Sequence, residues 1–148
     1  MRRIAWLIFG AACAPPPVPD ALLPRLQILT PEDGFELALR PAASEDESGC
    51  VYEITVTVDV DNFDVHQPET DEVEVEGSGH WHLYPDGEPG RYKSGYNAVA
   101  TYIGNDASPG NLTMVAELHS NQHAPVDDIE AALDRVEVAL TPSADPCE

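Results

Sequence analysis

Basic residues are scarce in this sequence. Its 148 residues include 7 Lys and Arg against 27 Asp and Glu, which gives a formal net charge of −20. A surface of that sign repels nucleic acid and anionic lipid, so we expect no nucleic-acid partner. Solubility or a high-salt habitat explains the charge, and weak attraction of cations is the alternative. The length allows one domain, and a hydrophobic content of 43% is enough for its core.

A long apolar run is also lacking near the N-terminus. The run Ile4–Phe9 is too short to span a bilayer as a helix. It follows two arginines and precedes the small residues Gly10–Ala12, an order typical of a secretion signal. We therefore expect residues 1–12 to be a signal peptide and the protein to be exported.

Cysteine is rare and odd in number, with three in the chain. The first, Cys13, lies in a stretch that resembles the bacterial lipobox, although Gly10 stands where leucine is usual. This resemblance implies a lipid on Cys13 and a cell-envelope location, either the outer membrane or the periplasmic face. Cleavage after Ala14 is the alternative. With Cys13 lipidated, Cys50 and Cys147 are left as a disulfide pair in an oxidising compartment.

The remaining sequence divides into a tether and a β-rich domain. Residues 13–24 are rich in proline and predict a stiff, extended tether. Alternation of apolar and polar residues then predicts short strands in residues 25–148, and residues Val126–Leu133 predict a short helix. The expected strands are Arg25–Leu29, Phe35–Arg40, Cys50–Phe63, Gly79–Tyr84, Asn97–Ile103, Asn111–Ser120 and Arg135–Leu140.

About seven short strands with a tryptophan on a central one indicate an all-β fold, an immunoglobulin-like antiparallel β-sandwich. In the strand around Trp81, side chains alternate between faces, so Trp81 points into the core while His80 and His82 point away from it. In this topology that strand is antiparallel to Asn111–Ser120 in the same sheet. His119 therefore comes beside the histidine pair, and Cys50 and Cys147 meet at the opposite end of the sandwich.

All five histidines of the protein are expected at one end of the sandwich. His66 follows the strand Cys50–Phe63 there, and His123 follows His119. We predict a surface cluster of His80, His82 and His119, with His123 or His66 able to join. Imidazole nitrogens favour copper(II) or zinc(II), so either metal is the candidate cofactor. Purely structural histidines are the alternative, and Asp59, Asp61 and Asp64 leave a calcium site as a further one.

The glycine and histidine pattern resembles small secreted bacterial domains of the DUF4399-like, immunoglobulin-like kind, whose function is unknown. The resemblance implies the fold and an exported location but no activity. It covers about half of the mature chain. The matching residues are Gly77, Gly79, His80, His82 and Leu83, followed by Leu118, His119, His123 and Pro125.

Other absences narrow the function. Residues 83–118 contain no histidine, which argues against a copper–zinc superoxide dismutase, and the methionine runs usual in copper(I) carriers are missing. Neither a Gly-x-Ser-x-Gly elbow nor a phosphate loop is present, so we expect no enzyme. Two hypotheses remain: a metal-binding module of the cell envelope, and a structural or protein-interaction module whose protein partner the sequence does not identify.

Overall fold

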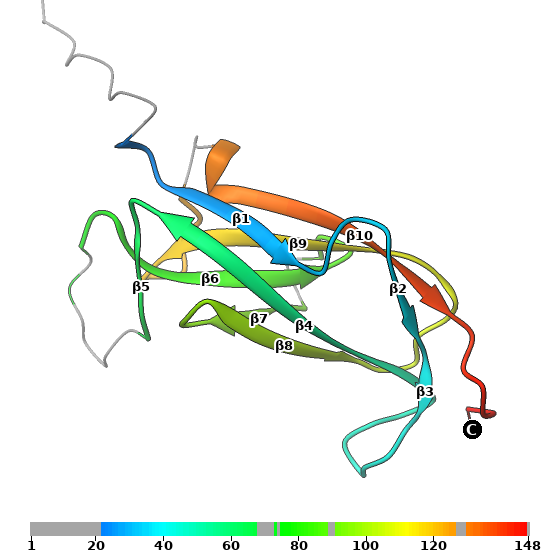
Figure 1. Ribbon diagram of the computed structural model, residues 1–148. Helices are drawn as coiled ribbons and strands as arrows, with labels where there is room; N and C mark the ends of the chain where they lie inside the picture. Colours follow the sequence, from blue (N-terminus) through cyan, green and yellow to red (C-terminus); the bar gives the residue numbers. More distant parts are fainter. Residues whose placement is uncertain (1–21, 68–72, 74, 89–90, 127–129, 148) are drawn as a thin grey trace, which may run out of the picture.

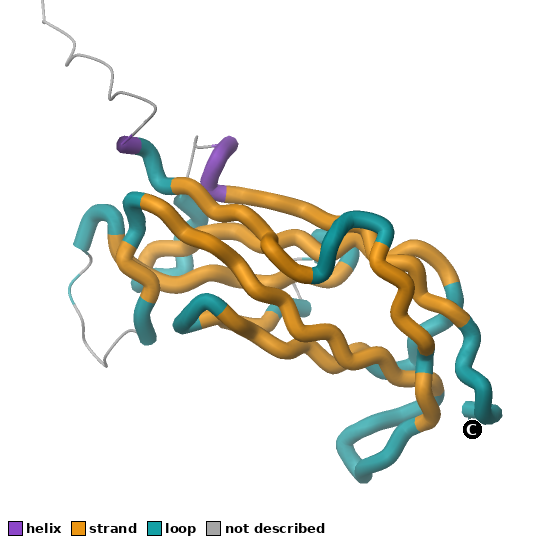
Figure 2. The backbone as a smooth tube through the Cα atoms, in the orientation of Figure 1, coloured by secondary structure: helices purple, strands orange, loops and turns teal. Residues whose placement is uncertain are grey.

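The computed structural model describes residues 22–67, 73, 75–88, 91–126 and 130–147. The predicted signal peptide, Cys13 and residues 13–21 of the tether lie outside the described residues. Figure 1 shows two β-sheets packed face to face, and Figure 2 shows that strands make up most of the described chain. The predicted all-β sandwich is confirmed.

The first sheet is built around β4 (Cys50–Asp61), the longest strand. This strand pairs antiparallel with β1 (Arg25–Thr30) on one side and β8 (Val99–Gly104) on the other, while the short β3 (Arg40–Pro41) pairs with its beginning. Alternate residues of β4 are buried because successive side chains point to opposite faces of the sheet.

The second sheet carries the histidines. Its strand order is β2–β10–β9–β6–β5, with β7 added beside β6. As predicted, the tryptophan strand β6 is antiparallel to β9, which is antiparallel to β10. The strands are β2 (Phe35–Ala38), β5 (Asp64–Val65), β6 (Ser78–Pro85), β7 (Lys93–Gly95), β9 (Gly110–Ser120) and β10 (Leu133–Thr141). The prediction of a wholly antiparallel sandwich is wrong in this sheet, because β2 pairs parallel with β10 and β5 pairs parallel with β6.

Trp81 is fully buried between the sheets, as the alternation predicts. Its cross-strand partner is Leu118, and Val58 and Leu83 belong to the same hydrophobic core. The indole Nε1–H donates to the carbonyl of Asn97 at 2.8 Å, so its one polar group is satisfied. On the inner face β6 is therefore an ordinary core strand, and its unusual residues lie on the other face.

Several expected boundaries are wrong. The predicted strand Phe35–Arg40 is split into β2 and β3, because the chain leaves β10 for the edge of β4 at this point. The expected helix is a 3-10 turn over Glu130–Ala132 within the described residues, and β10 begins directly after it. Residues 127–129 of that segment lie outside the described residues. The short strands β5 and β7 were not expected, and both flank the histidine strand.

The disulfide between Cys50 and Cys147 is present as predicted. It joins the start of β4 to the chain after β10 and so ties the two sheets together at the end away from the histidines.

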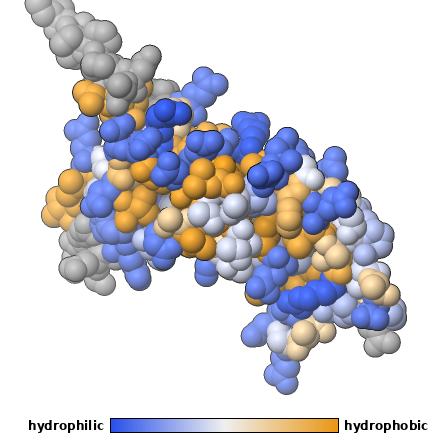
Figure 3. Space-filling model, viewed as in Figure 1, coloured by the Kyte–Doolittle hydropathy of each residue, from blue (hydrophilic) through white to orange (hydrophobic). Residues whose placement is uncertain are grey.

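None of the described helices has the length and apolar character of a membrane span. Figure 3 shows hydrophobic patches set among hydrophilic residues on the face of the sandwich seen in Figure 1.

Candidate metal centre

Strand β6 holds His80 and His82 on its outer face, one pleat apart. His80 lies directly opposite His119 of β9, so three imidazoles gather on this face as the topology predicts. The predicted exposure of this cluster is wrong: His80 is 0%, His82 3% and His119 4% exposed. These three side chains lie on the face opposite the hydrophobic core and are nevertheless shielded from solvent.

Aromatic side chains from the segment after β6 cover this face. The ring of Tyr92 stacks on His82, with centroids 4.1 Å apart and planes 20° from parallel. The ring of Tyr96 lies 5.6 Å from that of His80. Both tyrosines are exposed while the histidines beneath them are buried, so the tyrosine rings lie between the histidines and solvent. The sequence predicted a loop over Glu88–Gly95, and Tyr92 within it was the signal that this segment packs on the sheet.

His123 reaches the cluster from a tight turn after β9. Its φ of 62° lies in the left-handed region, and its N–H donates to the carbonyl of Ser120 at 3.0 Å. The chain then folds back along β9: Val126 donates to the carbonyl of Leu118, and Pro125 bridges to His119. This return places the ring of His123 over β6.

The three nitrogen atoms that face one another form a triangle. His80 Nε2 lies 2.9 Å from His82 Nε2 and 3.2 Å from His123 Nδ1. His123 Nδ1 lies 3.3 Å from His82 Nε2, which closes the triangle. Two of these histidines are buried and His123 is exposed. We call His80, His82 and His123 the histidine triad.

The edges of this triangle match the ligand spacing around a metal ion. Zinc–imidazole bonds of about 2.0–2.1 Å place two tetrahedral ligands about 3.3–3.4 Å apart, and ligands at a right angle about 2.9 Å apart. The observed edges of 2.9, 3.2 and 3.3 Å lie in this interval. The histidine triad can therefore hold one metal ion.

His119 supports the histidine triad rather than joining it. Its Nδ1–H donates to the carbonyl of His123 at 3.1 Å, which fixes the backbone of the third triad residue. Its Nε2 lies 2.8 Å from the hydroxyl of Tyr84 and 2.9 Å from Glu117 Oε2. Both nitrogens of His119 thus face oxygen atoms.

Tyr84 connects His119 to His82. Its hydroxyl lies 3.0 Å from His82 Nδ1. When that nitrogen carries the proton, it donates to the hydroxyl and leaves the lone pair of Nε2 directed into the histidine triad. A hydrogen bond of this kind on the remote nitrogen orients metal-binding histidines and sets their tautomer. Nδ1 of His80, by contrast, is buried and has no hydrogen-bond partner among the described residues.

Burial lowers the pKa of His80 and of His82 and so keeps these two imidazoles uncharged. Loss of hydration, followed by repulsion from the neighbouring histidines, lowers the pKa of His80 to about 4 and that of His82 to about 3. Burial and the nearby Glu117 raise the pKa of the Tyr84 hydroxyl to about 12. Metal ions bind neutral imidazole, so His80 and His82 are held in the ligating form.

His66 comes to the expected end of the sandwich but not into the histidine triad. It follows β5, and its backbone N–H donates to the carbonyl of Gly79 next to His80. Its Nδ1–H donates to the carbonyl of Asp64 at 3.3 Å. All five histidines therefore gather at one end, as predicted, with His66 at the margin.

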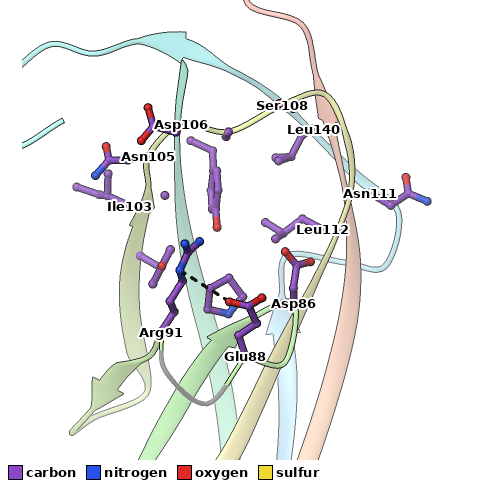
Figure 4. A pocket seen from close by; sticks show the side chains of 15 residues that line it. Asp86, Glu88, Arg91, Ile103, Asn105, Asp106, Ser108, Asn111, Leu112 and Leu140 are labelled. Atoms are coloured by element: carbon purple, nitrogen blue, oxygen red, sulfur yellow. Dashed lines mark ion pairs between the residues drawn. The ribbon is translucent and has the colours of Figure 1, made fainter. Parts of the chain in front are cut away.

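The histidine triad is the only group of possible metal ligands with mutual distances below 4.8 Å in the described part of the chain. Asp59, Asp61 and Asp64, the calcium candidates, form no such group with other described residues. A separate cleft of about 530 Å³ lies at the opposite end of β6 (Figure 4), where Arg91 pairs with Glu88 at 3.8 Å. None of the described residues that line this cleft is a histidine.

Glycines shape this region. A side chain at Gly79 would overlap the backbone of β9 at His119, so glycine lets the two strands meet beside His80. Gly77 turns the chain into β6 with a φ of 77°. The two glycines of the sequence motif therefore have structural explanations of their own.

Comparison of the chain with protein-family models, curated proteins and solved structures gives no match. The resemblance to DUF4399-like domains therefore stays an expectation.

Proposed function

We propose that this domain is a binding module for zinc(II) or copper(II), and not an enzyme. The ligands are Nε2 of His80, Nε2 of His82 and Nδ1 of His123. The observation that carries the proposal is the closed triangle of these nitrogens, with edges of 2.9, 3.2 and 3.3 Å. The net charge of −20 favours the approach of a divalent cation without choosing between metals.

A structural module is the second candidate. The 2.9 Å separation of the two Nε2 atoms of His80 and His82 also fits an N–H···N hydrogen bond. In that case the histidines tie β6 to the turn after β9, and their loss lowers stability without affecting metal binding.

Calorimetric titration with zinc(II) and copper(II) separates the two candidates. We expect one ion per chain, and we expect His80→Ala/His82→Ala and His123→Ala each to lower the affinity at least 100-fold. His66→Ala is the matched control, because it removes an imidazole at the same end of the sandwich but outside the triad. If binding by the wild type is no tighter than binding by the double variant, the structural candidate stands.

We also propose that the protein is exported and anchored by a lipid on Cys13, after removal of residues 1–12. The disulfide between Cys50 and Cys147 supports an oxidising compartment. Residues 13–24 then space the domain from the membrane, on the outer membrane or the periplasmic face. Cys13→Ala should move the protein from the membrane fraction to the soluble fraction. An unchanged membrane fraction for this variant would contradict the lipid anchor.

A further inference from the structure

We propose that the histidine triad holds a tetrahedral divalent ion whose fourth ligand comes from outside the chain. We further propose that this fourth position takes a small neutral nitrogen donor, such as an imidazole, in preference to a small carboxylate or azide anion. The inference rests on the proposed metal binding and goes beyond it by assigning a ligand to the site.

The described part of the chain offers three donors to the site, because the nearest further candidates in it are engaged elsewhere. His119 directs both nitrogens at oxygen atoms, with Glu117 Oε2 at 2.9 Å and the carbonyl of His123 at 3.1 Å. The Tyr84 hydroxyl lies between His82 and His119. Among the described residues, the group with ligand atoms close enough to share one ion stops at three histidines.

The triangle also restricts the coordination geometry. In a square-planar site, three ligands include two that lie opposite each other, about 4.0–4.2 Å apart for bonds of 2.0–2.1 Å. The longest edge of the histidine triad is 3.3 Å, so no two nitrogens can lie on opposite sides of an ion. Three neighbouring ligands leave the fourth corner of a tetrahedron, which is the arrangement that zinc(II) and cobalt(II) accept readily.

A cavity beside the histidine triad is the route by which an outside molecule would reach that corner. It has a volume of about 530 Å³ and is lined by two triad members, His82 and His123. Tyr92 and Val115 form part of its wall. The space is far larger than one water molecule, whose share of liquid volume is about 30 Å³.

The wall of the cavity carries negative charge and no positive charge among the described residues. Glu117 is part of its lining, and none of the described residues that line it is Lys or Arg. The ion's own charge of +2 attracts an anion, but Glu117 and the net charge of −20 of the whole chain both oppose that attraction. A neutral nitrogen donor meets no such opposition and can pack its ring against the tyrosines.

Cobalt(II) makes the fourth position visible, because the intensity and position of its visible absorption report coordination number and ligand type. We would load the full domain with one cobalt(II) at pH 8 and titrate it with imidazole, azide and acetate. The expected result is a strong four-coordinate band that shifts and saturates with imidazole. Azide and acetate should require at least ten-fold higher concentrations. Equilibrium dialysis must show that cobalt stays bound throughout.

Val115→Phe tests the route through the cavity, because this side chain lines it without being a ligand. The variant should keep cobalt affinity within about two-fold and lose at least ten-fold in imidazole affinity. Leu133→Phe provides a second wall variant with the same expectation, and unfolding midpoints verify that both fold. Bound cobalt with a spectrum unchanged by imidazole, or tighter binding of azide than of imidazole, overturns this inference alone. Absence of stoichiometric cobalt binding overturns the proposed metal site itself.

Discussion

At the scale of single residues, burial of His80 and His82 makes the stability of the metal-free protein depend on pH. The pKa of each is lowered in the fold, to about 4 and about 3, from an ordinary value of 6.5. Between pH 6.5 and 4 the unfolded chain therefore binds more protons than the folded one. Their contribution to stability is complete above pH 6.5 and is lost as the pH falls toward 4.

Urea unfolding of the metal-free protein across pH 8 to 4.5 measures this effect. We expect a constant midpoint above pH 7 and a falling midpoint below 6.5. The variant His80→Gln/His82→Gln cannot take up these protons, so its midpoint should change less between pH 6.5 and 5. Equal slopes for the two proteins would assign the effect to other groups.

Tyr84 gives a second residue-scale prediction. Its hydroxyl is the partner of His82 Nδ1, at 3.0 Å, and so holds the ligand ring in place. Tyr84→Phe keeps the ring volume but removes this partner, and we expect a 10- to 100-fold loss of zinc affinity, as removal of such supporting groups typically causes. Competition with a chromogenic chelator measures the loss. Tyr102→Phe, on the other sheet, is the matched control and should leave zinc affinity unchanged.

At the scale of elements, β6 shows what sequence periodicity can and cannot predict. Its period of two was enough to predict a buried Trp81 and histidines on the opposite face. The same reasoning predicted that the histidine face is exposed to solvent, because alternation along one strand does not show which other segments pack on it. Tyr92 and the turn holding His123 cover the face through contacts between distant segments, and strand alternation does not encode these.

The pairing of β6 with β7 gives a prediction at this scale. A side chain at Gly95 would overlap the indole ring of Trp81, so only glycine fits where β7 crosses the tryptophan. Gly95→Ala should destabilise the domain by about 1–3 kcal/mol, as overpacking of a filled core does. Ser94→Ala, one residue earlier on β7, is the control and should cost less. Chemical denaturation monitored by tryptophan fluorescence compares the two variants, and equal stabilities would argue against this packing.

At the scale of the whole molecule, the predicted strand order accounted for more of the structure than any single residue did. Placing β4 in one sheet and β6, β9 and β10 in the other was sufficient to bring Cys50 to Cys147 and the histidines to the opposite end. The choice of His123 over His119 as the third triad member was not predictable. It depends on a left-handed turn and on which nitrogen atoms already face oxygens.

The two ends of the sandwich should therefore stabilise the protein independently. The disulfide spans 97 residues, and a loop of that length corresponds to about 4–5 kcal/mol in the loop-entropy model. Zinc that binds only the folded state adds a separate increment to the free energy of unfolding. This increment grows with the ratio of the free zinc concentration to the dissociation constant. Two sites that are distant and share no contacts make additive contributions to the free energy of unfolding.

The variant Cys50→Ala/Cys147→Ala tests this independence. It should unfold at lower urea concentration than the wild type, yet a fixed concentration of zinc should raise the unfolding free energy of both proteins by the same amount. Urea titrations with zinc and with a chelator, for wild type and variant, complete the comparison. A zinc increment that disappears with the disulfide would mean that the histidine end is organised only when the cysteine end is closed, and that the two ends of the fold are coupled.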